Sequence, residues 1–183
     1  MPLDPLSRRE FVGAVTGSLA AVWIAGAGRP ALASAGRVLE PAQLRDLDAI
    51  TALILPTDDT PGAREARVVD FIDRSLASFA AEQRPLFDAG LADLNARAAP
   101  RVSGAAGFAA LGADDATALL QELDAEHSPF FEVMRVATIT GFLANPEYGG
   151  NAEKAGWKVI GFDDRFVWSA PFGWYDGEGA AAQ

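Results

Sequence analysis

The chain lacks cysteine altogether and has a single histidine, His127, among its 183 residues. Without cysteine it can hold no disulfide, no thiolate-ligated cluster and no covalently attached haem. A single histidine also leaves too few ligands for a ferritin-like di-iron site, which needs two Glu-x-x-His pairs, or for a tetrahedral zinc site. These absences argue against a metal- or haem-dependent catalyst.

Motifs for nucleotide cofactors and for nucleophilic catalysis are missing as well. The sequence contains neither Gly-x-Ser-x-Gly nor Gly-x-Gly-x-x-Gly, so neither a nucleophile elbow nor a dinucleotide site is predicted. The acidic residues Asp58 and Asp59 lie in a loop of turn-forming residues, which we interpret as a solvated acidic turn rather than a calcium site. We therefore expect no cofactor and no metal in this chain.

Basic residues are scarce, with 15 Lys and Arg against 25 Asp and Glu and a formal net charge of −10. Nucleic acids and anionic membrane surfaces attract basic patches, so neither is expected as a direct partner. The length is that of one domain with a sizeable core.

The strongest local motif is SRREFV at positions 7–12, which is typical of a twin-arginine export signal built on Arg8, Arg9 and Phe11. The stretch that follows is only moderately apolar and too short to favour a permanent membrane span. Ala31 and Ala33 are small residues at the positions that a signal peptidase reads, and a second register ends at Ala35. We expect a removable signal at 1–33 and a mature domain at 34–183 in the periplasm, the alternative being an uncleaved amphipathic anchor.

A folded-export signal is unexpected on a chain without its own cofactor. The simplest explanation is that the signal serves a cofactor-bearing companion, so that this chain acts as an escort and subunit.

Helical spacing of apolar residues runs through most of the mature chain and predicts a mainly α domain of about five helices. Pro56 and Pro100 should stop the first and third helices, and Ser128-Pro129 is a start signal for the fifth. The expected helices cover about 41–55, 64–81, 87–98, 114–123 and 129–144.

After Pro146 the glycine content rises and the helical spacing ends, with at most a short strand over 158–162. Aromatic residues are concentrated there, and their rings either complete the core of the domain or anchor an interface. The sequence leaves both interpretations open. The residues concerned are Trp157, Phe162, Phe166, Trp168, Phe172, Trp174 and Tyr175.

Several stretches, taken together, resemble the gluconate 2-dehydrogenase subunit 3 family. Asn145 stands where this family more often has aspartate, and Trp174 where tyrosine is common. The matching stretches are LILPTDD (53–59), PGAREA (61–66), VDFID (69–73), NPEYGGN (145–151), GWKVIGF (156–162) and PFGWYD (171–176).

The resemblance implies a non-catalytic small subunit of a periplasmic or membrane-bound sugar, sugar-acid or alcohol dehydrogenase. In such complexes a large flavoprotein of the glucose-methanol-choline type holds FAD, and a multihaem cytochrome c often accepts the electrons. The small subunit accompanies the flavoprotein through the twin-arginine translocase and is needed for its maturation or stability.

The turn NPEYGGN either forms a structural corner that orients the aromatic segment or lies on the surface that binds the large subunit. A different class of function, a stand-alone periplasmic protein that stacks its aromatic segment on sugar rings, is the main alternative. The candidate partner-binding residues are Tyr148, Gly149, Gly150, Asn151, Trp157, Trp168, Phe172, Trp174 and Tyr175.

Overall fold

The computed structural model describes residues 37–102 and 107–165. This part of the protein contains six α-helices and no strand. The prediction of a mainly α fold is confirmed. The helices are α3 (Pro41–Ile54), α4 (Val68–Leu76), α5 (Arg84–Ala98), α6 (Ala113–Ala125), α7 (Pro129–Leu143) and α8 (Ala155–Val159).

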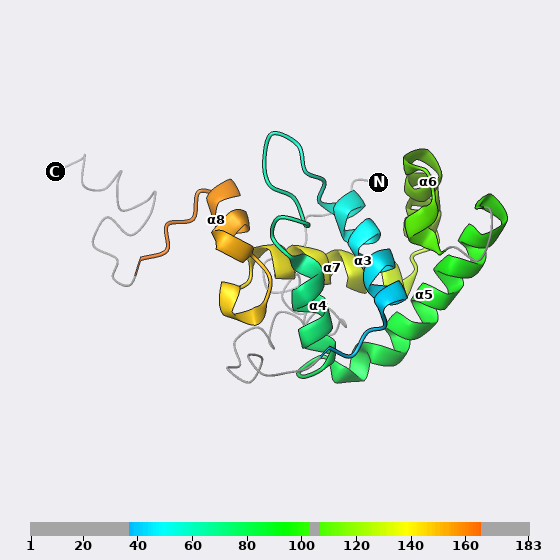
Figure 1. The fold of residues 1–183 in the computed structure, drawn as a ribbon, viewed down its shortest axis with the longest axis horizontal. Coiled ribbons are helices and arrows are strands. Elements are labelled where there is room, and N and C mark those ends of the chain that lie inside the picture. The colour runs from blue at the N-terminus through cyan, green and yellow to red at the C-terminus, as the bar shows by residue number, and fades with distance from the viewer. Residues whose placement is uncertain (1–36, 103–106, 166–183) are drawn as a thin grey trace, which may run out of the picture.

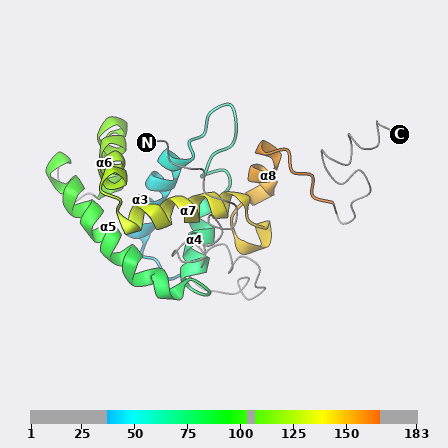
Figure 2. The same ribbon diagram turned by 180° about the vertical axis from the view of Figure 1, so that it is seen from behind.

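Helix α7 is the centre of the arrangement, because it packs against each of the other five helices. It lies behind α3 and α4 in Figure 1 and in front of them in Figure 2. Helix α6 lies near the N-terminal end of α7, and α8 near its C-terminal end (Figure 1). The C-terminal end of α7 therefore lies beside α8, the helix that follows it in the described part of the chain.

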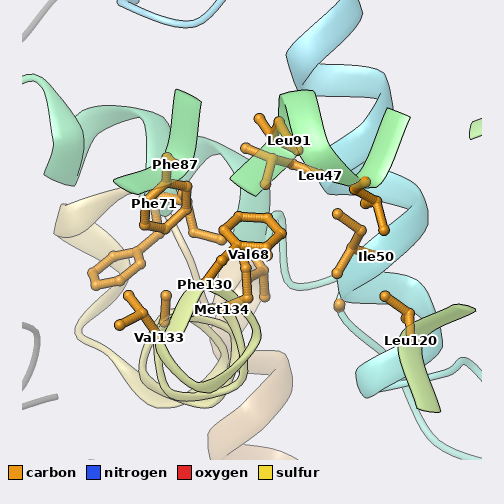
Figure 3. Close-up of a cluster of buried hydrophobic side chains, with 14 of the residues drawn as sticks. Leu47, Ile50, Val68, Phe71, Phe87, Leu91, Leu120, Phe130, Val133 and Met134 are labelled. Carbon is orange, nitrogen blue, oxygen red and sulfur yellow. The ribbon is translucent and has the colours of Figure 1, made fainter. Parts of the chain in front are cut away.

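The core forms where the apolar faces of the helices meet α7 (Figure 3). The rings of Phe87 in α5 and Phe130 in α7 meet edge to face, with centroids 5.8 Å apart. Leu47 and Ile50 of α3 are fully buried in the same cluster, as their helical spacing predicted.

A buried carboxylate fastens the start of the described chain to α4. Oδ1 of Asp73 accepts hydrogen bonds from the backbone amides of Val38 at 3.0 Å and Leu39 at 2.9 Å, and Asp73 is almost completely buried. Backbone amides that are removed from water need such acceptors. Asp73 thus fixes the point at which the N-terminal segment joins the folded domain.

Replacing Asp73 with alanine should lower the free energy of unfolding by about 2 to 3 kcal/mol, because it leaves two backbone donors without their acceptor. Asp73→Asn keeps an oxygen at this position and should cost much less. Thermal or urea unfolding of the two variants measures the difference. Equal losses in both would show that the two amide bonds contribute little.

The second helix is shorter than predicted at both ends. We expected it over 64–81, whereas α4 is Val68–Leu76. Arg67 has a left-handed backbone with φ 55°, which separates the turn before it from the helix. At the other end the Ser78 hydroxyl donates to the carbonyl of Arg74, and the helix stops at Ala77.

Two further predictions are wrong in detail. The stretch 158–162 contains no strand, because the sixth helix, α8, occupies Ala155–Val159 and a turn follows it. Asp114 does not cap α6. Gly112 holds that position, and Asp114 lies in the first turn, where its charge complements the helix dipole.

Candidate functional site at the junction of α7 and α8

The motif NPEYGGN forms a tight reversal directly after α7. The Asn145 side chain accepts a hydrogen bond from the amide of Glu147 at 3.1 Å and so begins a short 3₁₀ turn, Pro146–Tyr148. An aspartate at this position would offer the same acceptor. Gly149 then takes φ 102°, and the side chain of Arg74 lies against its backbone.

Asn151 closes the end of α7 from inside the protein. Its Nδ2 donates to the carbonyl of Ala144 at 2.8 Å, and its Oδ1 accepts from the amide of Gly156 at 2.8 Å. The side chain is completely buried. Because the last carbonyls of a helix have no partner within the helix, Asn151 supplies the missing donor and joins α7 to α8.

Trp157 satisfies the neighbouring carbonyl of the same helix end. Its indole Nε1 donates to the carbonyl of Leu143 at 2.8 Å, while the ring stays half-buried. The hydrogen bonds donated by Asn151 and Trp157 hold the segment after α7 against the end of that helix. The NPEYGGN turn therefore bonds backbone groups at the end of α7 through Asn151, and whether it also lies on the surface that binds a large subunit stays a prediction.

Two glycines let the backbones at this junction approach closely. A Cβ on Gly150 would lie 2.2 Å from the carbonyl oxygen of Gly141, and one on Gly156 would lie 1.9 Å from that of Phe142. Neither distance is compatible with a side chain. We call this unit, residues 145–157 with the end of α7, the α7–α8 junction.

The junction also joins two stretches that are far apart in sequence. The amide of Ala152 donates to the carbonyl of Ala66 at 3.1 Å. The Phe71 side chain borders both Gly141 and Gly150, at 2.8 and 3.0 Å from the positions where a Cβ would stand. The motifs at 61–73 and 145–157 are therefore parts of one packed unit.

Beyond the junction the chain exposes apolar side chains. Ile160 is 59 % exposed, and Val159 and Phe162 are exposed beside it. The rings of Trp157 and Phe162 meet with centroids 5.1 Å apart. We call Trp157, Val159, Ile160 and Phe162 the α8 ridge, a rigidly supported hydrophobic surface of the kind that marks protein contacts.

Sequence reasoning identified Trp157 but missed Val159 and Ile160 as exposed. Both belong to GWKVIGF, and an apolar run of this kind in a short helix has no periodicity that distinguishes its buried side from its exposed side. Tyr148 is half-buried and packs against the core, whereas Gly150 and Asn151 are buried. These three belong to the packed side of the junction and not to the ridge.

The acidic loop between α3 and α4 is ordered by its own hydrogen bonds. The Glu65 carboxylate accepts from the hydroxyl of Thr57 at 2.7 Å and from the amide of Gly62 at 2.9 Å. The hydrogen bond from Thr57 holds the pKa of Glu65 below its usual value, and the amide of Thr60 does the same to the pKa of Asp58. Asp58 and Asp59 are exposed, as expected of a solvated turn.

No cluster of three or more potential metal ligands occurs within residues 37–102 and 107–165. His127 is exposed in a left-handed turn with φ 52° after α6. None of the helices in this part of the chain has the length and apolar character needed to cross a bilayer.

The remaining predicted residues lie outside the described residues. They are the export and cleavage residues Arg8, Arg9, Phe11, Ala31 and Ala33 and the aromatic residues Trp168, Phe172, Trp174 and Tyr175.

The fold and the junction define a small helical protein that presents a hydrophobic ridge on a rigid support. Residues 41–164 match the family described as Gluconate 2-dehydrogenase subunit 3. The match covers more than half of the chain, so the protein belongs to the gluconate 2-dehydrogenase subunit 3 family, as its motifs predicted. Comparison with curated proteins and with solved structures gives no match. Membership of this family is consistent with a non-catalytic subunit of a dehydrogenase complex.

Proposed function

We propose that this protein is the small, non-catalytic subunit of an FAD-dependent sugar, sugar-acid or alcohol dehydrogenase, and that the α8 ridge binds its catalytic subunit. The observation that carries the proposal is the exposure of Ile160, Val159 and Phe162 directly after a junction that is fixed by buried hydrogen bonds. Apolar side chains that are held in one position in water do not stabilise a monomer. At an interface the same side chains bind a partner with a smaller loss of conformational entropy, because they are already ordered.

The catalytic subunit in this proposal is a flavoprotein of the glucose-methanol-choline type. It carries FAD and the substrate pocket, and a multihaem cytochrome c is a further candidate partner. In this proposal the small subunit contributes packing at the interface and no cofactor. Binding at the ridge would stabilise the flavoprotein by mass action, because a partner that binds only the native state shifts the folding equilibrium toward it.

Export to the periplasm is the second part of the proposal. The signal with Arg8 and Arg9 would engage the twin-arginine translocase, which moves folded proteins, and the small subunit would thereby escort the flavoprotein. Such a role would account for a twin-arginine motif on a chain without cysteine and with one histidine.

Ile160→Asp tests the ridge. We expect at least about a tenfold lower yield of co-purified catalytic subunit, because a charge would be buried at the interface. The melting temperature of the isolated chain should stay unchanged, since the substitution is at an exposed position. Pull-down of the flavoprotein and thermal unfolding of the purified small subunit provide the two measurements.

Ile139→Asp is the matched control, because Ile139 is 45 % exposed on α7 and lies outside the ridge. It should leave the yield of complex near that of the wild type. Equal loss of complex in both variants would show that added charge acts non-specifically, and normal complex formation by Ile160→Asp would exclude the ridge as the anchor.

A further inference from the structure

A second surface, separate from the α8 ridge, runs along the outer side of α3. Two hollows of about 520 and 420 Å³ adjoin there and share Arg45 and Ala109 in their walls. A smaller hollow of about 170 Å³ shares Asp48, Arg64 and Asp70 with the second one. We call this continuous depression the α3 trough.

Buried hydrogen bonds fix one wall of the trough. Small side chains, those of Ala42, Ala49 and Ala109, line part of it. The buried carboxylate of Asp46 accepts from Nδ2 of Asn95 at 2.8 Å and from the amide of Ala109 at 3.0 Å. These bonds hold the 3₁₀ turn Phe108–Ala110 against α3, so the trough has a defined shape before any partner binds.

Each rim guanidinium group that forms an ion pair is more exposed than the carboxylate with which it pairs, although Asp48 beside Arg64 is itself 44 % exposed. The side chain of Arg37 is 66 % exposed and that of Asp70, which pairs with it at 3.1 Å, is only 19 % exposed. Arg67 makes a second contact with Asp70 and is as exposed as Arg37. A partner that approaches the trough therefore meets cations first.

Most of the hydrogen-bond donors on this rim remain available. Arg64 contacts Asp48 through Nε at 2.9 Å, so its two terminal nitrogens are not used in that contact. Arg45 forms no ion pair with any residue in the described part of the chain. Guanidinium groups with free donors bind carboxylates in a bidentate manner, which is the geometry that such a rim offers.

We propose that the α3 trough binds a carboxylate-rich segment of the catalytic subunit, as a second contact besides the α8 ridge. This inference rests on the proposed function for the identity of the partner. The chain as a whole has a net charge of −10 and repels an acidic partner, whereas the rim gathers four arginines at one place where such a partner can approach. The trough would then set the orientation in which the two subunits meet.

The test uses the full-length complex, purified through a tag on the small subunit and washed at increasing NaCl. The double variant Arg45→Glu/Arg64→Glu should retain about tenfold less catalytic subunit at low salt, where exposed charges are least screened. Arg45→Lys/Arg64→Lys, which keeps the charges, should retain most of it. Arg135→Glu is the control, because Arg135 is an exposed arginine with one acidic partner, like Arg64, but lies on α7 outside the trough.

Binding of a fluorescent glutamate-rich peptide to the purified chain tests the trough without the partner. We expect binding by the wild type and by Arg135→Glu, and loss of binding by Arg45→Glu/Arg64→Glu. Wild-type retention of the catalytic subunit by the double variant at every salt concentration would overturn the proposal. If the purified chain sediments with phosphatidylglycerol vesicles in a way that depends on Arg45 and Arg64, and does not bind the peptide, the proposal would be overturned in favour of a lipid surface. A wild-type chain that brings down no flavoprotein would contradict the proposed function. The peptide assay would still show whether the trough binds carboxylate-rich segments.

Discussion

Replacement of both Arg8 and Arg9 with lysine is expected to leave the flavoprotein partner in the cytoplasm. Lysine keeps the positive charge but not the planar guanidinium fork, so the double variant separates recognition of the arginine pair from simple attraction of charge. If the flavoprotein has no signal of its own, its export depends entirely on this chain, and the loss should approach completeness. Immunoblots of periplasmic and cytoplasmic fractions, with dehydrogenase activity in each, measure it.

Arg29→Lys is the matched control, because Arg29 lies in the same expected signal but outside the pair. It should leave both proteins in the periplasm. If the flavoprotein is exported normally with Arg8→Lys/Arg9→Lys, the escort role is excluded, whereas the structural role of the α8 ridge is not affected.

Gly156→Ala is expected to have the largest effect on folding. The added methyl would stand 1.9 Å from the carbonyl oxygen of Phe142, so either α8 or the end of α7 must move. Such overpacking against backbone costs about 3 kcal/mol, and here it also disturbs the hydrogen bond between the amide of Gly156 and Asn151. Both the melting temperature and the yield of complex should fall, in contrast to Ile160→Asp.

Gly112→Ala is the control for this variant, because nothing lies within 4 Å of its added methyl. It should change the free energy of unfolding by less than about 1 kcal/mol. A Gly156→Ala protein with the melting temperature and the yield of complex of the wild type would show that the α7–α8 junction tolerates displacement. The junction would then not be a rigid support for the ridge.

The long helices were predictable because their apolar spacing and their boundary residues agree. Pro41 and Pro56 bracket α3, and Ser128-Pro129 stands at the start of α7. The Ser128 side chain nevertheless makes no capping hydrogen bond, so the fixed φ of Pro129 is the part of that signal which the structure supports.

The α7–α8 junction could not be derived from local patterns. Asn151 and Trp157 act on carbonyls seven and fourteen residues earlier in the chain, and only the folded arrangement brings those atoms within 2.8 Å. The five-residue helix α8 is too short for a helical period to be read from it, so its apolar run resembled a strand. Similarity to a family drew attention to these residues, and the structure shows which backbone groups each of them contacts.

The α3 trough was missed for a related reason. Arg37, Arg45, Arg64 and Arg67 are scattered over the sequence of an acidic chain, so net charge conceals them. The ion pair between Asp48 of α3 and Arg64 of the turn before α4 lies at this rim, where the four arginines line adjoining hollows. A surface of this kind depends on tertiary contacts, which composition does not describe.

Gentle purification of the tagged chain from its own host tests the central claim most directly, with an absorbance spectrum and mass spectrometry of whatever accompanies it. We expect a flavin spectrum together with a large flavoprotein, with haem bands if a cytochrome belongs to the complex. A colourless chain without any partner would contradict the subunit assignment. In that case a sugar-dependent rise in its melting temperature would favour the stand-alone sugar-binding alternative.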